Sequence, residues 1–372
     1  MSSEITSPAI IYSGAGSFSK TVSEAARLGT SAAVVLGQHL QDTEVIAGLL
    51  DNLHTHDMKA VICDPITTEP TVEMVDSLAG TIKRMGVDVV IAVGGGSVMD
   101  TAKAAAVMAV NDGLTEDYQL KRREIVNPPQ AQVFVPTTAG TGSEATRVSV
   151  LTNERAGVKR SISHPLMTPN AVILDPQLTV SLSKYLTTLT AMDAFAHAIE
   201  SAVSRNATSY TRHIALAGIE QLSAGLPACQ SSPDDLNARL MCLEGSCFAG
   251  LAMQSGLGAS HSLAPAVCIV TGIRHSEAVA ALLPHAIRLN ESHSHGTYDL
   301  VSRAMDCSDV ASRLEELCRL GGFNVNLAQF GLCASDWKKV CEVMNRYGSH
   351  RKTNPVEVTD AYAEEIFLAA VS

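Results

Sequence analysis

The sequence has few aromatic residues and no long apolar stretch. Only 4% of its 372 residues are Phe, Trp or Tyr, although 46% are hydrophobic. No uninterrupted apolar run approaches the ~18 residues that a membrane-spanning helix needs. The first residues, MSSEITSPAIIYSG, show neither the charged start nor the apolar core of a secretory signal peptide. We therefore expect a globular, cytoplasmic protein that has no membrane partner.

The chain also lacks an excess of positive charge. Its 27 Lys and Arg residues are outnumbered by 38 Asp and Glu residues, which gives a formal net charge of −11. Proteins that bind nucleic acids or anionic lipid surfaces carry basic patches, and no such stripe is apparent here. We expect a small-molecule ligand and no nucleic-acid partner.

The nine cysteines include no C-x-x-C pair. Paired spacings are typical of zinc ribbons and redox motifs, and an even number of cysteines is typical of small secreted domains. An odd number of scattered cysteines indicates reduced, mostly buried thiols in a cytosolic protein.

The first half of the chain alternates short apolar runs with stretches of helical periodicity. This pattern predicts a mostly parallel α/β sheet. The expected strands are residues 31–37, 59–63, 87–96, 131–138 and 170–176, with a hairpin over 148–163. After residue 183, strand-like runs nearly vanish and helical patterns continue to the end. We expect an α/β domain over 1–183 and a helical domain over 184–372.

The stretch VVIAVGGGSVMDTAK predicts a buried strand, a glycine-rich turn and a helix. Such a helix start offers free N–H groups and a positive dipole end to a phosphate. The phosphate-binding candidates are Gly94, Gly95, Gly96 and Ser97, and Asp100 is either a partner of the helix dipole or a cofactor ligand. The spacing is not the G-x-G-x-x-G fingerprint, and a tight turn without a ligand is the alternative.

A second glycine-rich turn, PTTAGTGSEAT, follows the predicted strand at 131–138. Its hydroxyls and backbone amides suit a clamp on a nucleotide or a substrate. The candidates are Thr137, Thr138, Thr141 and Ser143. A Ser/Thr/Gly loop without a ligand is the alternative. Two such loops after parallel strands agree with the rule that ligands bind at the carboxyl edge of an α/β sheet.

A polar pair interrupts the apolar segment TAMDAFAHAIESA. Asp193 and His197 are four residues apart and share one face of a helix. A surface carboxylate–imidazole pair is the ordinary interpretation. With His261 and His275 from a later apolar stretch, however, the pair completes a set suited to catalytic Zn²⁺ or Fe²⁺. His285 and Glu200 are expected to be outer supports or structural, and His164 is a candidate substrate contact. No role is expected for His39, His54, His56, His213, His293, His295 and His350.

Together these motifs resemble the iron-containing (group III) alcohol dehydrogenase family over nearly the whole chain. The resemblance implies a Rossmann-like NAD(P)-binding domain, a helical domain and a divalent metal, Fe²⁺ or Zn²⁺, in a dehydroquinate synthase-like architecture. It also implies a homodimer. The family's metal-ligand pattern falls on Asp193, His197, His261 and His275. Its cofactor pattern falls on Gly94, Gly95, Gly96, Ser97, Asp100, Thr137, Thr138, Thr141 and Lys159.

Two positions depart from the family pattern. Pro265 stands where members usually carry a further histidine near the substrate, so no imidazole at 265 can relay a proton. Gly37 stands where NAD-preferring members often carry an aspartate that faces the ribose 2′-hydroxyl and repels a 2′-phosphate. We therefore expect NADP to be accepted as well as NAD.

The function that the resemblance implies is hydride transfer between a nicotinamide and a small primary alcohol or its aldehyde. Two enzymes of related architecture are alternatives, namely dehydroquinate-synthase-like lyases and glycerol-dehydrogenase-like enzymes. The former need a basic pocket, whereas Arg274 and Arg288 are isolated in this sequence. A third alternative, motivated by Pro265, is a catalytically quiet relative that binds metal or nucleotide.

Overall fold

The computed structural model describes residues 4–347 and 350–372. The chain forms two compact units, each with its own internal contacts. The sheet unit comprises residues 4–138 and 143–179, and the helical unit comprises residues 139–142 and 180–372. The short segment 139–142 thus leaves the sheet unit and returns to it.

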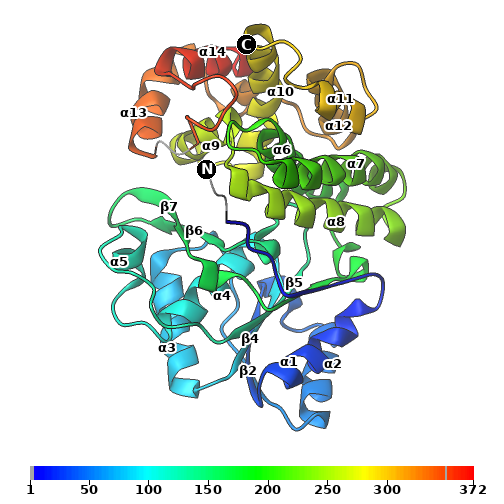
Figure 1. The fold of residues 1–372 in the computed structure, drawn as a ribbon, viewed down its shortest axis with the longest axis vertical. Helices are drawn as coiled ribbons and strands as arrows, with labels where there is room; N and C mark the ends of the chain where they lie inside the picture. Colours follow the sequence, from blue (N-terminus) through cyan, green and yellow to red (C-terminus); the bar gives the residue numbers. More distant parts are fainter. Residues whose placement is uncertain (1–3, 348–349) are drawn as a thin grey trace. The chain divides into compact units, whose positions relative to one another are not determined.

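The sheet unit is built on six parallel strands in the order β1-β8-β5-β4-β2-β3 (Figure 1). The strands are β1 Ile10–Ser13, β2 Ser31–Leu36, β3 Lys59–Ile62, β4 Val89–Gly94, β5 Ala131–Pro136 and β8 Ala171–Leu174. β2 and β4 pair with Val34 opposite Ile91, and β4 and β5 pair with Ile91 opposite Val133. The predicted parallel sheet is confirmed.

Helices cover both faces of this sheet. Ala32, Val34 and Leu36 of β2 join a core with α1 and α2, whereas Ala33 and Val35 join a core with α3 and α4. Because both faces are buried, the central strands are apolar at nearly every position rather than alternating. The helices are α1 Lys20–Leu28, α2 Glu44–Thr55, α3 Val72–Met85, α4 Gly96–Met108 and α5 Thr115–Gln119.

An antiparallel hairpin completes the sheet unit. Its strands are β6 Val148–Asn153 and β7 Val158–Ser163, as the sequence predicted for residues 148–163. The turn closes at Gly157, whose φ of 62° lies in the left-handed region that favours glycine.

The helical unit packs around α6, which is buried from Thr187 to Ala202 except at one position. A helix that is apolar on nearly all sides belongs in a core, and α6 contacts α7, α8 and α10. The helices are α6 Lys184–Val203, α7 Ser209–Ser231, α8 Leu236–Ala252, α9 Ala259–Thr271, α10 His275–His293, α11 Asp299–Ala304, α12 Val310–Leu320, α13 Trp337–Tyr347 and α14 Asp360–Ala370.

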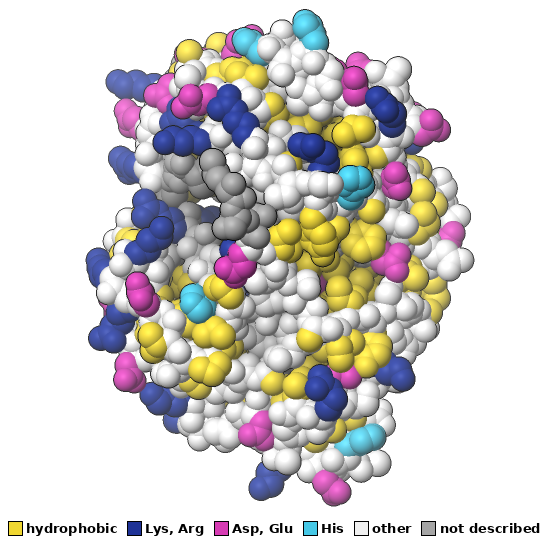
Figure 2. All heavy atoms as spheres, viewed as in Figure 1, with side chains coloured by type: hydrophobic (Ala, Val, Ile, Leu, Met, Phe, Trp, Pro, Cys, Tyr) yellow, Lys and Arg dark blue, Asp and Glu magenta, His cyan; other side chains and the backbone are white. Residues whose placement is uncertain are grey.

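The surface carries charges of both signs. On the face shown in Figure 2, Lys and Arg side chains are intermixed with Asp and Glu side chains rather than gathered into one basic stripe. No helix in the described part of the chain combines the length and the apolar character needed to cross a membrane.

Candidate metal centre and dinucleotide turns

Asp193 and His197 lie one turn apart on α6, inside the core of the helical unit. The side chain of Ser183 caps the start of this helix by accepting the Leu186 N–H. His197 Nε2 lies 3.9 Å from Asp193 Oδ1. The pair is buried, so the alternative of a surface ion pair is wrong.

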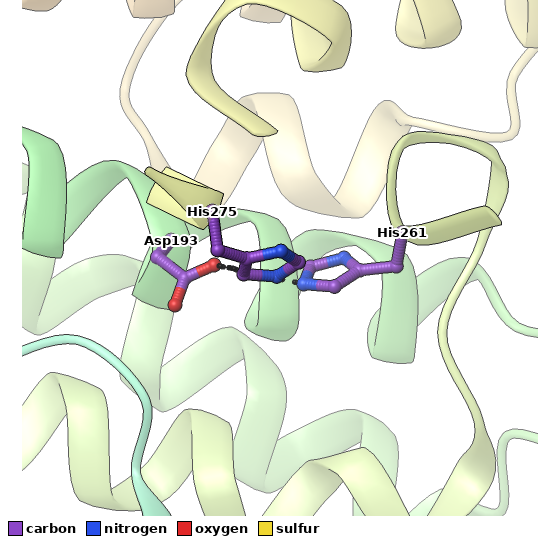
Figure 3. A group of neighbouring side chains, drawn as sticks. All are labelled: Asp193, His261 and His275. Atoms are coloured by element: carbon purple, nitrogen blue, oxygen red, sulfur yellow. Dashed lines mark ion pairs between the residues drawn. The ribbon is translucent and has the colours of Figure 1, made fainter. Parts of the chain in front are cut away.

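Two further histidines reach the same carboxylate from the starts of other helices. His261 lies in the first turn of α9, and His275 is the first residue of α10. Their Nε2 atoms lie 3.6 Å and 3.8 Å from Asp193 Oδ1 (Figure 3). Ligand atoms of Asp193, His261 and His275 lie within 4.8 Å of one another; among the described residues, His197 approaches the carboxylate without joining this mutual group.

Hydrogen bonds to the other ring nitrogens determine the protonation of two imidazoles. His261 Nδ1 lies 2.7 Å from Glu200 Oε2, and His197 Nδ1 lies 3.3 Å from the Gly140 carbonyl oxygen. Carbonyl and carboxylate oxygens only accept, so both Nδ1 atoms donate. In the neutral rings, the unprotonated Nε2 atoms then face Asp193.

When the rings are neutral, as metal binding requires, acceptor atoms therefore converge on one point. Neither His261 Nε2 nor Asp193 Oδ1 has a hydrogen-bond partner among the described residues, and both are buried. Their separation of 3.6 Å is too long for a hydrogen bond. One carboxylate and three imidazoles are a donor set for Zn²⁺ or Fe²⁺, so the residues present fit a divalent cation.

The electrostatics of the cluster favour a positive charge. Burial raises the pKa of the Asp193 carboxyl, but the three neighbouring imidazoles outweigh it and hold that pKa well below its usual range. Burial lowers the pKa of His261, but Glu200 and Asp193 overcome it and raise that pKa to about 9. Glu200 has a pKa of about 2, because its contacts with His261, Ser260 and Gly258 offset its burial. Two buried carboxylates thus stay ionised at neutral pH.

One member of the cluster is partly exposed. The side chain of His275 is 27% exposed, whereas those of Asp193, His197 and His261 are at most 8% exposed. A catalytic metal needs such an accessible position for the substrate.

The first glycine-rich turn lies at the carboxyl end of β4, near the middle of the sheet. Gly94 ends the strand, Gly95 precedes α4, and Gly96 and Ser97 form its first turn. A Cβ on Gly94 would lie 2.5 Å from the Val98 side chain, so this glycine lets the helix pack closely on the strand end. The helix start lies at the edge where ligands bind α/β sheets.

The second turn begins beside the first, at the end of the neighbouring strand β5. A Cβ on Gly95 would lie 3.3 Å from Thr138 Oγ1, and Thr137 donates its N–H to the Gly94 carbonyl at 2.9 Å. The two turns therefore touch. Thr141 lies beyond them, in the segment 139–142 of the helical unit, and Ser143 lies back in the sheet unit.

Known proteins share this architecture and these segments. The model of the family described as "Iron-containing alcohol dehydrogenase" matches residues 8–176, and that of "Fe-containing alcohol dehydrogenase family, C-terminal" matches residues 187–371. The "Probable alcohol dehydrogenase EutG" of Escherichia coli strain K12 is 31% identical over 337 residues, covering 89% of this chain and 85% of that protein.

The chain belongs to the iron-containing alcohol dehydrogenase family. The resemblance of the motifs is thereby confirmed. Among solved structures, 1,3-propanediol oxidoreductase is similar with a TM-score of 0.92 and 26% identity over 100% of both chains. Sulfoacetaldehyde reductase from Bifidobacterium kashiwanohense, solved in complex with NAD⁺, has a TM-score of 0.87 and 29% identity over 100% of this chain and 99% of that chain.

Membership makes the chain a metal-dependent oxidoreductase that interconverts alcohols and aldehydes, with NAD-dependent relatives. As in other members of the iron-containing alcohol dehydrogenase family, a parallel sheet precedes a helical region. The predicted fold class is confirmed.

In this iron-containing alcohol dehydrogenase, Asp100 is engaged inside the sheet unit. It accepts hydrogen bonds from Ser143 Oγ at 2.5 Å and from the Val150 N–H at 2.9 Å. Asp100 and Ser143 therefore connect α4 to the second turn, and their contact with a dinucleotide stays a prediction.

The sequence reasoning missed two neighbours of Asp100. Lys103 is fully buried and donates to the carbonyls of Ser143 and Val148, each at 2.7 Å. Burial lowers the pKa of Lys103 to about 8, and burial raises the pKa of Glu144 to about 7. The sequence did contain a signal, because Lys103 stands alone in the alanine-rich run DTAKAAAV.

The last two predicted cofactor residues lie elsewhere in the sheet unit. Gly37 follows β2 with a φ of −73°, which any residue can adopt, and a Cβ there would make an ordinary 3.6 Å contact with Val98. The backbone conformation at position 37 therefore does not require glycine. Lys159 lies on β7, and its Nζ is 3.1 Å from Glu69 Oε2.

The structure also places His350 beside the metal centre, although the sequence reasoning gave it no role. Its Nδ1 accepts the Leu257 N–H at 3.3 Å, just before α9. Burial and the nearby His261 lower the pKa of His350 to about 4. Nothing in the sequence pattern signalled this, because His350 lies in a loop without periodicity. Pro265 lies in α9, one turn after His261, and offers no N–H or side-chain donor.

Proposed function

We propose that the chain catalyses hydride transfer between NAD(P)H and a small aldehyde, and the reverse oxidation of the primary alcohol. Asp193, His197, His261 and His275 hold the cation, which is Fe²⁺ or Zn²⁺. The turn residues Gly94 to Ser97, with Thr137 and Thr138, hold the dinucleotide. This proposal assigns the dinucleotide to the sheet unit and the cation to the helical unit.

The observation that carries the proposal is the convergence of three imidazole Nε2 atoms on the buried Asp193 carboxylate, at 3.6 to 3.9 Å. A bound divalent cation supplies Lewis acidity that polarises the substrate oxygen. His275 is the partly exposed member of the cluster, so the substrate would approach from its side. The nicotinamide provides the hydride, and the protein provides position and field.

The proposal includes acceptance of NADP as well as NAD. Gly37 carries no carboxylate to repel a 2′-phosphate, and the structure leaves ordinary space at this position. The measurement is kcat/KM with NADH and with NADPH. A preference for NADH above ~100-fold, or about 2.7 kcal/mol, contradicts this part of the proposal.

The substrate that we propose is small and polar. Only 4% of the residues are aromatic, so a large apolar pocket has few side chains to line it. Two similar solved structures carry names that denote short substrates, 1,3-propanediol and sulfoacetaldehyde. Short aldehydes, with and without a second polar group, are therefore the first panel to assay.

We also propose a cytoplasmic homodimer. The nine cysteines are free, as expected in a reducing compartment, and members of the family commonly associate. Light scattering of the purified protein measures the number of chains in the assembly.

The deciding experiment is the consumption of NAD(P)H by Fe²⁺-loaded and Zn²⁺-loaded protein over the aldehyde panel. Stoichiometric oxidation of the cofactor supports the dehydrogenase and contradicts a lyase in which hydride transfer is transient. The second candidate function is the binding of metal or nucleotide without catalysis. It is favoured by Pro265, which stands where family members usually carry a histidine. Tight cofactor binding with no turnover on any aldehyde would support that candidate instead.

A further inference from the structure

Glu200 is a buried carboxylate that receives four hydrogen bonds at the start of α9. It lies on α6, three residues after His197. Its Oε2 accepts from the Gly258 N–H at 2.8 Å and from His261 Nδ1 at 2.7 Å. Its Oε1 accepts from the N–H and the hydroxyl of Ser260, at 2.8 Å and 2.6 Å.

All four partners donate, and this fixes the tautomer of His261. The backbone N–H groups cannot accept, and an ionised carboxylate cannot donate. His261 Nδ1 must therefore carry the proton, which leaves the lone pair of a neutral ring on Nε2. That atom faces Asp193 Oδ1 at 3.6 Å.

We propose that Glu200 is a positioning residue of the metal centre, which orients His261 and holds its proton away from the cation. The inference rests on the proposed cation site. Outer partners of this kind commonly change metal affinity without touching the metal.

Glu200→Gln distinguishes the orientation of His261 by Glu200 from a purely structural role, in which Glu200 only caps the start of α9. Glutamine keeps the shape of the side chain but replaces one acceptor oxygen by an NH₂ donor. In one orientation the NH₂ faces the Gly258 N–H, which it opposes, and His261, whose proton it forces onto Nε2, toward the cation. In the other it faces the N–H of Ser260, and two donors oppose each other in a buried site.

The test is a double-mutant cycle on cation affinity. Zn²⁺ affinity is measured by competition with a chelator for the wild type, Glu200→Gln, His261→Ala and the double variant. We expect Glu200→Gln to weaken binding by about 10- to 100-fold. In the His261→Ala background, the same change should alter affinity by less than ~3-fold, because the residue acts through His261.

Ser260→Ala is the matched control. It removes one donor to Glu200 and keeps the contact with His261, so Zn²⁺ affinity should stay within ~3-fold of the wild type. Wild-type affinity in Glu200→Gln, or an equal loss in both backgrounds, overturns the inference. Because the wild type is titrated in parallel, its failure to bind Zn²⁺ would instead refute the proposed function itself.

A second measurement needs no variant at position 200. In wild-type protein labelled with ¹⁵N-histidine, the His261 signals, assigned by their loss in His261→Ala, report which nitrogen carries the proton. We expect a protonated Nδ1 and an unprotonated Nε2 in the Zn²⁺ form. A protonated Nε2, or no hydrogen bond at Nδ1, overturns the inference even if Glu200→Gln does not fold.

Discussion

At the scale of single residues, the four proposed ligands differ in what holds them. Asp193 and His197 are fixed by a long buried helix, whereas His261 and His275 depend on where α9 and α10 begin. A helix start is set by caps and loop glycines rather than by periodicity. The assignment of His261 and His275 as ligands from sequence alone is therefore less certain than that of Asp193 and His197.

Substitution of these histidines tests the ligand set directly. His261→Ala and His275→Ala each remove one donor and should weaken the cation site by more than the ~10- to 100-fold typical of an outer partner. Metal content after dialysis, measured by elemental analysis, should fall far below one ion per chain, together with kcat/KM. His213→Ala, on the exposed face of α7, is the control. Stoichiometric metal in both ligand variants contradicts the assignment.

Glu144 makes stability depend on pH. Burial raises its pKa from 4.5 to about 7, so its contribution is complete below pH 4.5 and is lost as the pH rises through 7. From pH 5 to pH 8, the wild type should lose on the order of 2 kcal/mol that Glu144→Gln does not lose. Urea unfolding of metal-free protein at both pH values measures this difference. The exposed Glu154→Gln should behave like the wild type, and a pH-independent effect of Glu144→Gln would count against the prediction.

At the scale of elements, the segment 139–142 is fixed by close backbone packing in the helical unit. Gly142 has a φ of 59°, and a Cβ there would lie 2.6 Å from the Ser246 carbonyl oxygen on α8. A Cβ on Gly140 would lie 2.9 Å from Thr190 on α6, and the Gly140 carbonyl receives His197 Nδ1. These glycines belong to the turn that the sequence predicts to bind a nucleotide or substrate. They also allow close packing against α6 and α8, and the Gly140 carbonyl orients the proposed metal ligand His197.

Gly142→Ala should therefore lower the free energy of unfolding by more than the cost of placing an alanine in the left-handed region. Gly157→Ala is the matched control, because its φ of 62° is nearly the same and nothing lies within 4 Å of its Cβ. We expect about 1 kcal/mol for the control and at least ~3 kcal/mol for Gly142→Ala, where backbone must move. Unfolding midpoints of the two variants give the comparison. Equal losses would show that the close contact relaxes at no cost.

The elements that the sequence predicted well are those whose burial is uniform. The central strands are mostly apolar and bounded by small or polar residues, so their type and approximate extent could be read from the sequence. β1 was missed because it has four residues, half of them exposed, at the edge of the sheet. The assignment of 139–142 to the helical unit depends on contacts between glycines and distant helices, which no local pattern encodes. Lys103 and His350 were missed for the same reason, because their partners lie far away in the sequence.

At the scale of the whole molecule, the two units divide the proposed ligands between them. Every proposed metal ligand lies in the helical unit, and the phosphate-binding candidates Gly94 to Ser97 lie in the sheet unit. A ligand that binds only the native state stabilises it by RT ln(1 + [L]/Kd), or about 2.7 kcal/mol at one hundred times Kd. Each ligand should therefore raise the melting temperature independently of the other's site.

Two substitutions make this independence measurable by calorimetry. Asp193→Asn removes the carboxylate that the imidazoles face, so the stabilisation by Zn²⁺ should vanish while that by NADPH persists. Ser97→Glu places a negative charge in the first turn of α4, where it repels the diphosphate, so the stabilisation by NADPH should vanish while that by Zn²⁺ persists. Loss of the NADPH effect in Asp193→Asn would contradict the division, because the dinucleotide would then depend on the metal ligands for its binding.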